Sequence, residues 1–125
     1  MRSKYGNRKI MTADGEFDSR HEYQRWCELK LLERAGKITH LKRQEKYLLI
    51  PAQYETHERI SDKTGKKLKD GRRCVEKECS YVADFVYFLP DGELVVEDAK
   101  GVRTEGYIIK RKLMLQVYGI KISEV

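Results

Sequence analysis

The chain has 125 residues, with 26 Lys and Arg against 20 Asp and Glu, so its formal net charge is +6. This length corresponds to one domain. The longest apolar runs, such as Leu48-Leu49-Ile50, are too short for a transmembrane helix. The N-terminal residues lack the apolar stretch of a secretory signal, and three cysteines fit a reducing compartment better than a disulfide framework. We therefore expect a single basic domain in the cytoplasm, with no membrane contact.

The first predicted element is a helix over residues 19–35. Ser19 and Glu22 have the spacing of a capping box, and Gly36 stands where a helix stop is expected. Asp14-Gly15 indicates a turn before this helix. Residues 1–13 form a basic N-terminal arm, whose cations are Arg2, Lys4, Arg8 and Lys9.

The middle of the chain reads as strands, because β-branched and aromatic residues alternate between turn signals. Short strands are predicted at 38–41 and 47–52, and residues 55–78 form a polar insertion that is either a long loop or a projecting hairpin. Two further strands, 81–89 and 93–100, are joined by the turn Pro90-Asp91-Gly92.

The pattern becomes helical again over residues 105–118, where Gly119 follows as a C-terminal cap, and residues 120–125 close as a last strand. The order of helix, strands, helix and strand predicts a single-domain α/β fold. We expect a mixed β-sheet of four or five strands, flanked by the first and last helices.

Several charged residues fall where the pattern predicts a core. Asp84 shares one face of its strand with Val82, Val86 and Phe88, and the aromatics on the opposite face, Tyr81, Phe85 and Tyr87, read as packing. On the partner strand, Asp98 and Lys100 continue an apolar stripe. A buried carboxylate is costly unless it is paired, hydrogen-bonded or metal-bound.

The helices add further polar groups to these inward faces. At about 100° per residue, Glu22 lies between Trp26 and Leu29, and Lys112 and Gln116 fall among apolar residues of the last helix. Each of these polar residues also has a simpler explanation. Asp84 or Asp98 could form an ion pair with Lys100, and Glu22 could be the capping-box partner of Ser19. The side chain of Lys112 could extend across the apolar face and place its ammonium group in solvent. A shared site explains them together, and clustered carboxylates with a lysine suit Mg²⁺ or Mn²⁺.

The residues that carry this pattern resemble a known superfamily. Glu22 on a first helix, Tyr81-Val82-Ala83-Asp84-Phe85 on one strand and Glu97-Asp98-Ala99-Lys100-Gly101 on the next are similar to the PD-(D/E)XK nucleases. Across Lys4 to Val125, the chain resembles a small phage and prophage family of unknown function, and the arrangement is also similar to archaeal-type Holliday-junction resolvases. Ala83 replaces the proline of the motif, and the 55–78 insertion has no counterpart in a minimal resolvase core.

The resemblance implies a restriction-endonuclease-like core and a Mg²⁺- or Mn²⁺-dependent endonuclease that hydrolyses branched or recombination-intermediate DNA. It assigns the metal to Asp84, Asp98, the carbonyl of Ala99 and Glu22. Lys100 would orient the attacking water or stabilise the pentacovalent phosphorus. Lys112 and Gln116 would hold a neighbouring phosphate or water. No small-molecule cofactor is expected.

Two basic clusters are predicted to follow the DNA backbone, giving binding that depends on salt rather than base sequence. The first is the N-terminal arm, and the second lies in the insertion and comprises Lys63, Lys66, Lys67, Lys69, Arg72 and Arg73. Alternative functions are a non-catalytic DNA-binding or adaptor protein with the nuclease fold, and a structural phage protein whose buried charges form ion pairs. A junction-cleaving enzyme would be a homodimer, because a two-fold axis supplies two equivalent sites.

Overall fold

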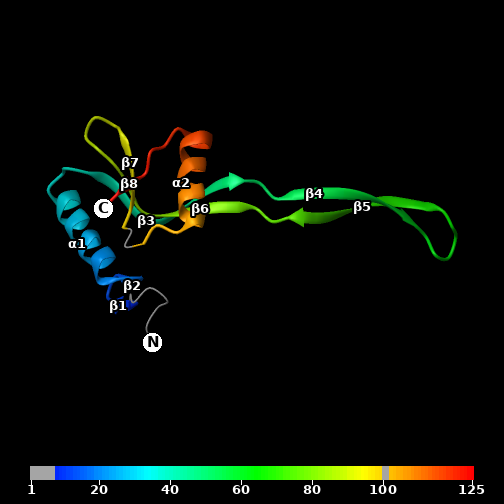
Figure 1. The fold of residues 1–125 in the computed structure, drawn as a ribbon, viewed down its shortest axis with the longest axis horizontal. Helices are drawn as coiled ribbons and strands as arrows, with labels where there is room; N and C mark the ends of the chain where they lie inside the picture. The colour runs from blue at the N-terminus through cyan, green and yellow to red at the C-terminus, as the bar shows by residue number, and fades with distance from the viewer. Residues whose placement is uncertain (1–7, 100–101) are drawn as a thin grey trace.

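A four-stranded mixed sheet forms the centre of the computed structural model, which describes residues 8–99 and 102–125. Its strands, in spatial order, are β3 (Thr39–Ile50), β6 (Cys79–Phe88), β7 (Leu94–Asp98) and β8 (Ser123–Glu124). Strand β6 is antiparallel to both of its neighbours, β3 and β7, and β8 is parallel to β7. Helices α1 (Arg20–Arg34) and α2 (Glu105–Tyr118) lie on either side of the sheet (Figure 1). The predicted α/β fold, with a mixed sheet between two helices, is confirmed.

Helix α1 covers one face of the sheet, and its start follows the predicted cap. The backbone N–H of Glu22 donates to Ser19 Oγ at 3.1 Å, and Gly36 adopts a positive φ of 74° just after the helix. Leu29 packs with Phe85 and Tyr87 of β6 in one buried cluster. The apolar side of α1 therefore fixes the helix against the central strand.

Helix α2 covers the other face, with Tyr107 and Met114 buried against Val86 and Val96. Because these two residues are seven positions apart, they mark one side of the helix, and residues 112 and 116 lie on the opposite side. Gly119, at φ 69°, ends the helix as predicted. In the described ranges, neither helix combines the length and apolar composition that crossing a bilayer requires.

Strand β3 is one continuous strand, although the sequence predicted two short ones. Its middle, Lys42 to Lys46, alternates between exposed and half-buried positions, and so lacks the apolar pattern of a strand. Pairing with β6 supplies the backbone hydrogen bonds that keep it extended, despite positive φ values at His40 and Gln44. The last predicted strand, 120–125, shortens to the two residues of β8.

A small hairpin precedes α1. Its strands, β1 (Ile10–Thr12) and β2 (Gly15–Phe17), are antiparallel and flank the predicted turn at Asp14-Gly15. Phe17 is buried, and the guanidinium carbon of Arg43 lies 3.7 Å from the centre of its ring. Part of the predicted arm is therefore ordered against the body of the protein.

The insertion forms a two-stranded antiparallel ribbon that projects from the body (Figure 1). We call residues 53–76 the ribbon; it consists of β4 (Gln53–Ile60), β5 (Lys67–Glu76) and the turn between them. Every residue of β4 is exposed, and Gly71 is the one half-buried position of β5. The insertion is therefore a hairpin, whose strands begin at Gln53 and end at Glu76, rather than a long loop.

Candidate functional site

The three predicted acidic ligands come from different elements, Glu22 from the first turn of α1, Asp84 from the middle of β6 and Asp98 from the end of β7, and we call them the acidic junction. Glu22, in the first turn of α1, is 2% exposed and accepts the backbone N–H of Asp18 at 2.8 Å through Oε2. Its carboxyl group also hydrogen-bonds with that of Asp84. Asp84 Oδ2 in turn accepts the backbone N–H of Ala99 at 2.8 Å. These contacts tie α1, β6 and the end of β7 together.

Asp98 is 1% exposed, and its Oδ2 accepts a hydrogen bond of 2.5 Å from the hydroxyl of Tyr81. Burial, followed by this hydrogen bond and the charges of Asp98 and Asp84, raises the pKa of Tyr81 well above its usual value. Tyr81 therefore stays a neutral donor at physiological pH. Its prediction as a packing residue missed this contact, because the sequence does not show that the phenol reaches across to β7.

Glu97, next to Asp98, makes a separate set of contacts. Both of its oxygens accept from Arg25 of α1, with Nε at 2.8 Å and one terminal nitrogen at 2.7 Å, and the Tyr87 hydroxyl also donates to it. Burial and this hydrogen bond raise the pKa of Tyr87 to about 12. The sequence analysis did not predict these contacts of Glu97. An acidic residue in an otherwise apolar strand could have indicated that Glu97 needs a buried partner.

The Glu22 carboxyl group has a raised pKa, mainly because burial disfavours its charged form. The backbone N–H of Asp18 and the positive charge of Arg43 oppose this shift, while the charge of Asp18 adds to it. The hydrogen bond with Asp84 also lowers the pKa of Glu22, so burial is the cause that decides the direction of the shift.

The acidic junction fits a hard cation in its donor chemistry, since carboxylate oxygens are the ligands that Mg²⁺ and Mn²⁺ prefer. Glu22 and Asp84 are already in contact, and Asp98 lies one residue from the amide that binds Asp84. Across residues 8–99 and 102–125, however, no three His, Cys, Asp or Glu side chains are arranged closely enough to hold a metal ion. The carbonyl of Ala99 stays a predicted ligand.

The remaining predicted catalytic residues do not join the acidic junction. Lys100 lies outside the described residues. Lys112 and Gln116 are exposed, so the prediction that they point toward the sheet is wrong, because the buried side of α2 is centred on Tyr107 and Met114. Lys112 instead lines a separate pocket of about 350 Å³ with Leu115 and Lys121.

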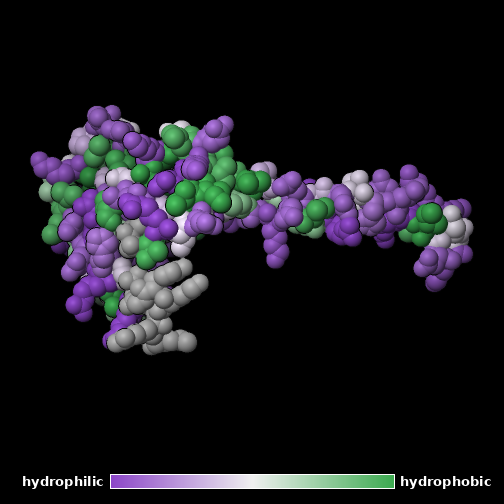
Figure 2. All heavy atoms as spheres, in the orientation of Figure 1, coloured by the Kyte–Doolittle hydropathy of each residue, from purple (hydrophilic) through white to green (hydrophobic). Residues whose placement is uncertain are grey.

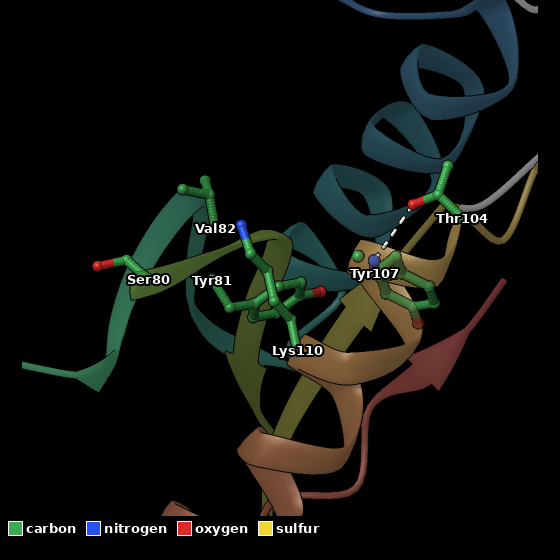
Figure 3. A pocket seen from close by; sticks show the side chains of 7 residues that line it. Ser80, Tyr81, Val82, Thr104, Tyr107 and Lys110 are labelled. Atoms are coloured by element: carbon green, nitrogen blue, oxygen red, sulfur yellow. Dashed lines mark hydrogen bonds between the residues drawn. The ribbon is translucent and has the colours of Figure 1, made fainter. Parts of the chain in front are cut away.

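Lys110 of α2 lies near Tyr81, the residue that donates to Asp98. It lines a pocket of about 370 Å³ between the start of α2 and β6, together with Tyr81 and Tyr107 (Figure 3). Thr104 caps the helix there by accepting the backbone N–H of Tyr107 at 3.2 Å. The pocket therefore shares Tyr81 with the acidic junction.

The predicted DNA-binding residues fall into two groups. Arg8 and Lys9 are exposed near β1, with Lys9 Nζ 3.9 Å from Glu16, whereas Arg2 and Lys4 lie outside the described residues. The other six are exposed along the ribbon, from its turn to the middle of β5: Lys63, Lys66, Lys67, Lys69, Arg72 and Arg73. Figure 2 shows the ribbon as mainly hydrophilic, in contrast to the mixed surface of the body.

Fold and site together define a small α/β protein with a buried acidic junction beside its central strand pair and a basic ribbon outside its body. The chain belongs to the family described as "Protein of unknown function (DUF1064)", whose model matches residues 2–123. No curated protein and no solved structure matches the chain.

Proposed function

We propose that the protein is a metal-dependent DNA endonuclease of the PD-(D/E)XK superfamily, acting on branched or recombination-intermediate DNA in phage DNA metabolism. The observation that supports this most is the chain of contacts from Glu22 through Asp84 to the Ala99 amide, beside Asp98. These contacts join Glu22 of α1 to Asp84 of β6, and Asp84 to the amide that follows Asp98 of β7. An ion-pair network would not require two carboxyl groups to touch.

In this proposal, Glu22, Asp84, Asp98 and the carbonyl of Ala99 would hold Mg²⁺ or Mn²⁺. The cation, when bound, lowers the pKa of a coordinated water and neutralises charge on the scissile phosphate. The chain's own residues position these ligands. The Asp18 amide holds Glu22, the Ala99 amide holds Asp84, and the Tyr81 hydroxyl holds Asp98. Lys100 would orient the attacking water or stabilise the phosphorane.

The test is incubation of the purified protein with linear duplex, single-stranded, flap and four-way-junction DNA in Mg²⁺, Mn²⁺ or EDTA. We expect cleavage that requires metal, is strongest on branched DNA, and is abolished in Asp84→Asn and Asp98→Asn. Asp91→Asn is the matched control, because Asp91 lies in the exposed β6–β7 turn and an asparagine there keeps the bond to the Glu93 N–H.

Gel retardation without cleavage under every metal condition would contradict the enzyme and favour the non-catalytic DNA-binding alternative. The absence of both retardation and cleavage would favour the structural alternative. If four-way junctions are cut, the protein should be a homodimer by light scattering, because symmetric cleavage needs two equivalent sites.

A further inference from the structure

The cations of the ribbon are gathered in one stretch of its sequence. Residues 59–73, which we call the tip segment, contain seven Lys and Arg and two Asp, whereas the whole ribbon, which also holds Glu55, Glu58 and Glu76, carries a net charge of +2. All seven cationic residues are exposed. The tip segment therefore has a local excess of positive charge on the part of the chain that projects from the body (Figure 1).

Few of these cations have acidic partners. Arg73 pairs with Glu55, and Lys67 Nζ lies 3.9 Å from Glu58. Within the described ranges, the tip segment shows no ion pair for its other cations, which are Arg59, Lys63, Lys66, Lys69 and Arg72. Like charges repel, and an isolated two-stranded hairpin is only marginally stable in water. A polyanion would relieve this repulsion and stabilise the ribbon.

The cations point to both faces of the ribbon. Arg72 pairs in register with Thr56, and its guanidinium carbon lies 3.7 Å from the ring centre of Tyr54 on the same face. Arg73 pairs in register with Glu55 on the other face. A ribbon that lay flat on an anionic surface would use one face. Cations on both faces suit a channel that has phosphates along both walls.

We propose that the ribbon lies in the major groove of double-stranded DNA, where its cations contact the phosphates on both sides. The major groove is about 12 Å wide and admits a two-stranded β-ribbon, whereas the minor groove is about 6 Å wide. At about 3.3 Å per residue, the eight residues of β4 extend roughly 26 Å, a length of about eight base pairs. The proposal deepens the proposed function, on which it rests for DNA as the ligand.

The first test measures duplex binding in EDTA by fluorescence anisotropy over a range of salt concentrations. Lys63, Lys66 and Lys69 are changed together to Ala, and the matched control changes three exposed lysines of the body, Lys37, Lys42 and Lys121. We expect affinity to fall at least tenfold in the ribbon variant, with the salt slope reduced by about one unit for each phosphate that a lysine no longer neutralises. The body variant should bind almost as tightly as the wild type.

A second variant shortens the ribbon, replacing residues 57–71 by Asn-Gly between the register partners Thr56 and Arg72. Asn-Gly forms the two-residue turn that closes such hairpins. In dimethyl sulfate footprints, the wild type should protect guanine N7, which lies in the major groove, and the shortened variant should not. Protection of adenine N3 instead would place the ribbon in the minor groove and overturn the proposal.

Double-stranded RNA of the same sequence gives a further control. The deep, narrow major groove of A-form RNA does not admit side chains, so shortening the ribbon should change RNA affinity much less than DNA affinity. An equal decrease on both duplexes would mean general charge attraction, and the groove assignment would be wrong.

These outcomes separate the ribbon from catalysis. If ribbon variants bind and cut DNA as the wild type does, the ribbon proposal fails and the nuclease stands. If the wild type binds duplex DNA through the ribbon but never cuts, the nuclease fails and the ribbon proposal stands. A ribbon variant that changes the oligomeric state and leaves DNA affinity intact would assign the ribbon to an interface between copies, against the proposal.

Discussion

Glu97 and Asp98 are neighbours in β7 and equally buried, yet they face different helices and have different partners. On the α1 side, Glu97 is held by a charged group, since both of its oxygens accept from Arg25. On the α2 side, Asp98 accepts from a neutral phenol, that of Tyr81. The amide of the next residue, Ala99, binds Asp84, which contacts Glu22.

Burial alone therefore does not distinguish a carboxylate that pairs with a cation of the fold from one that we propose as a metal ligand. Glu97 and Arg25 form a bidentate pair whose geometry is complete within the protein. Asp98 accepts from a neutral hydroxyl and is followed by the amide that binds Asp84. The face of the strand, rather than the residue type, thus decides the chemistry.

Removing the partner of Glu97 should have the largest effect on stability. Arg25→Ala leaves a buried carboxylate without its cation and should lower the free energy of unfolding by about 3–5 kcal/mol. Urea denaturation monitored by circular dichroism measures this decrease. Adding Glu97→Gln to Arg25→Ala should restore part of it, since the uncompensated charge is then gone. A decrease below about 1 kcal/mol in the single variant would show that this pair does not stabilise the fold.

A matched pair of tyrosine variants should sharpen the contrast between the two faces. Tyr81→Phe removes a donor from Asp98 and should cost about 1.5–3 kcal/mol, as expected for a hydrogen bond to a charged group. Tyr87→Phe should cost about 1 kcal/mol, because Glu97 keeps two N–H donors from Arg25. Denaturation midpoints of the two variants give the comparison, and the reverse order would contradict our ranking of the two hydrogen bonds.

Asp98→Asn should change stability little, because an asparagine oxygen still accepts from Tyr81. We expect a difference within about 1 kcal/mol, since the variant also removes one charge from a cluster of like charges. Under the proposed function, cleavage should fall by orders of magnitude, and Mg²⁺ should no longer raise the melting temperature. Glu97→Gln should show the opposite pattern, with lower stability and cleavage retained while the protein is folded.

The smallest effect concerns the pH dependence of stability in EDTA. The folded pKa of Glu22 is raised, so the folded state binds the proton more tightly than the unfolded state. The contribution of Glu22 is therefore fully present below its unfolded pKa and is lost as pH rises through the folded pKa. In Glu22→Gln, melting curves across the weakly acidic range should no longer show this decline. An unchanged slope would mean that Glu22 does not titrate in this range.

Much of the fold follows from short-range signals in the sequence. Ser19 marks the start of α1, and Gly119 marks the end of α2. The turn at Pro90-Asp91-Gly92 marks the β6–β7 hairpin. The inward direction of Glu22 also follows from helix periodicity, and the structure confirms its burial. These features depend on residues within a few positions of one another.

The contacts around the site depend on partners far apart in the sequence. Arg25 and Glu97 are 72 residues apart, so no local pattern joins them. Tyr81 and Val86 share a cluster, although simple alternation along the strand puts them on opposite faces. The helix pattern of α2 contains apolar residues all around, and the burial of Tyr107 and Met114 decides its orientation. Tertiary packing therefore supplies what the sequence pattern leaves open.

Because the ribbon projects from the body, the chain could be cut at the ribbon's turn without breaking a strand of the central sheet. β3 and β6 pair along most of their length on the body side of the ribbon, while the tip turn at 61–66 contributes no residue to either core cluster. A single proteolytic cut in that turn would leave both fragments with one strand of the β3–β6 pair. Fragments 1–62 and 63–125 should reassemble into the native body without a covalent link, and they would offer a two-part reporter that regains its fold when its halves meet.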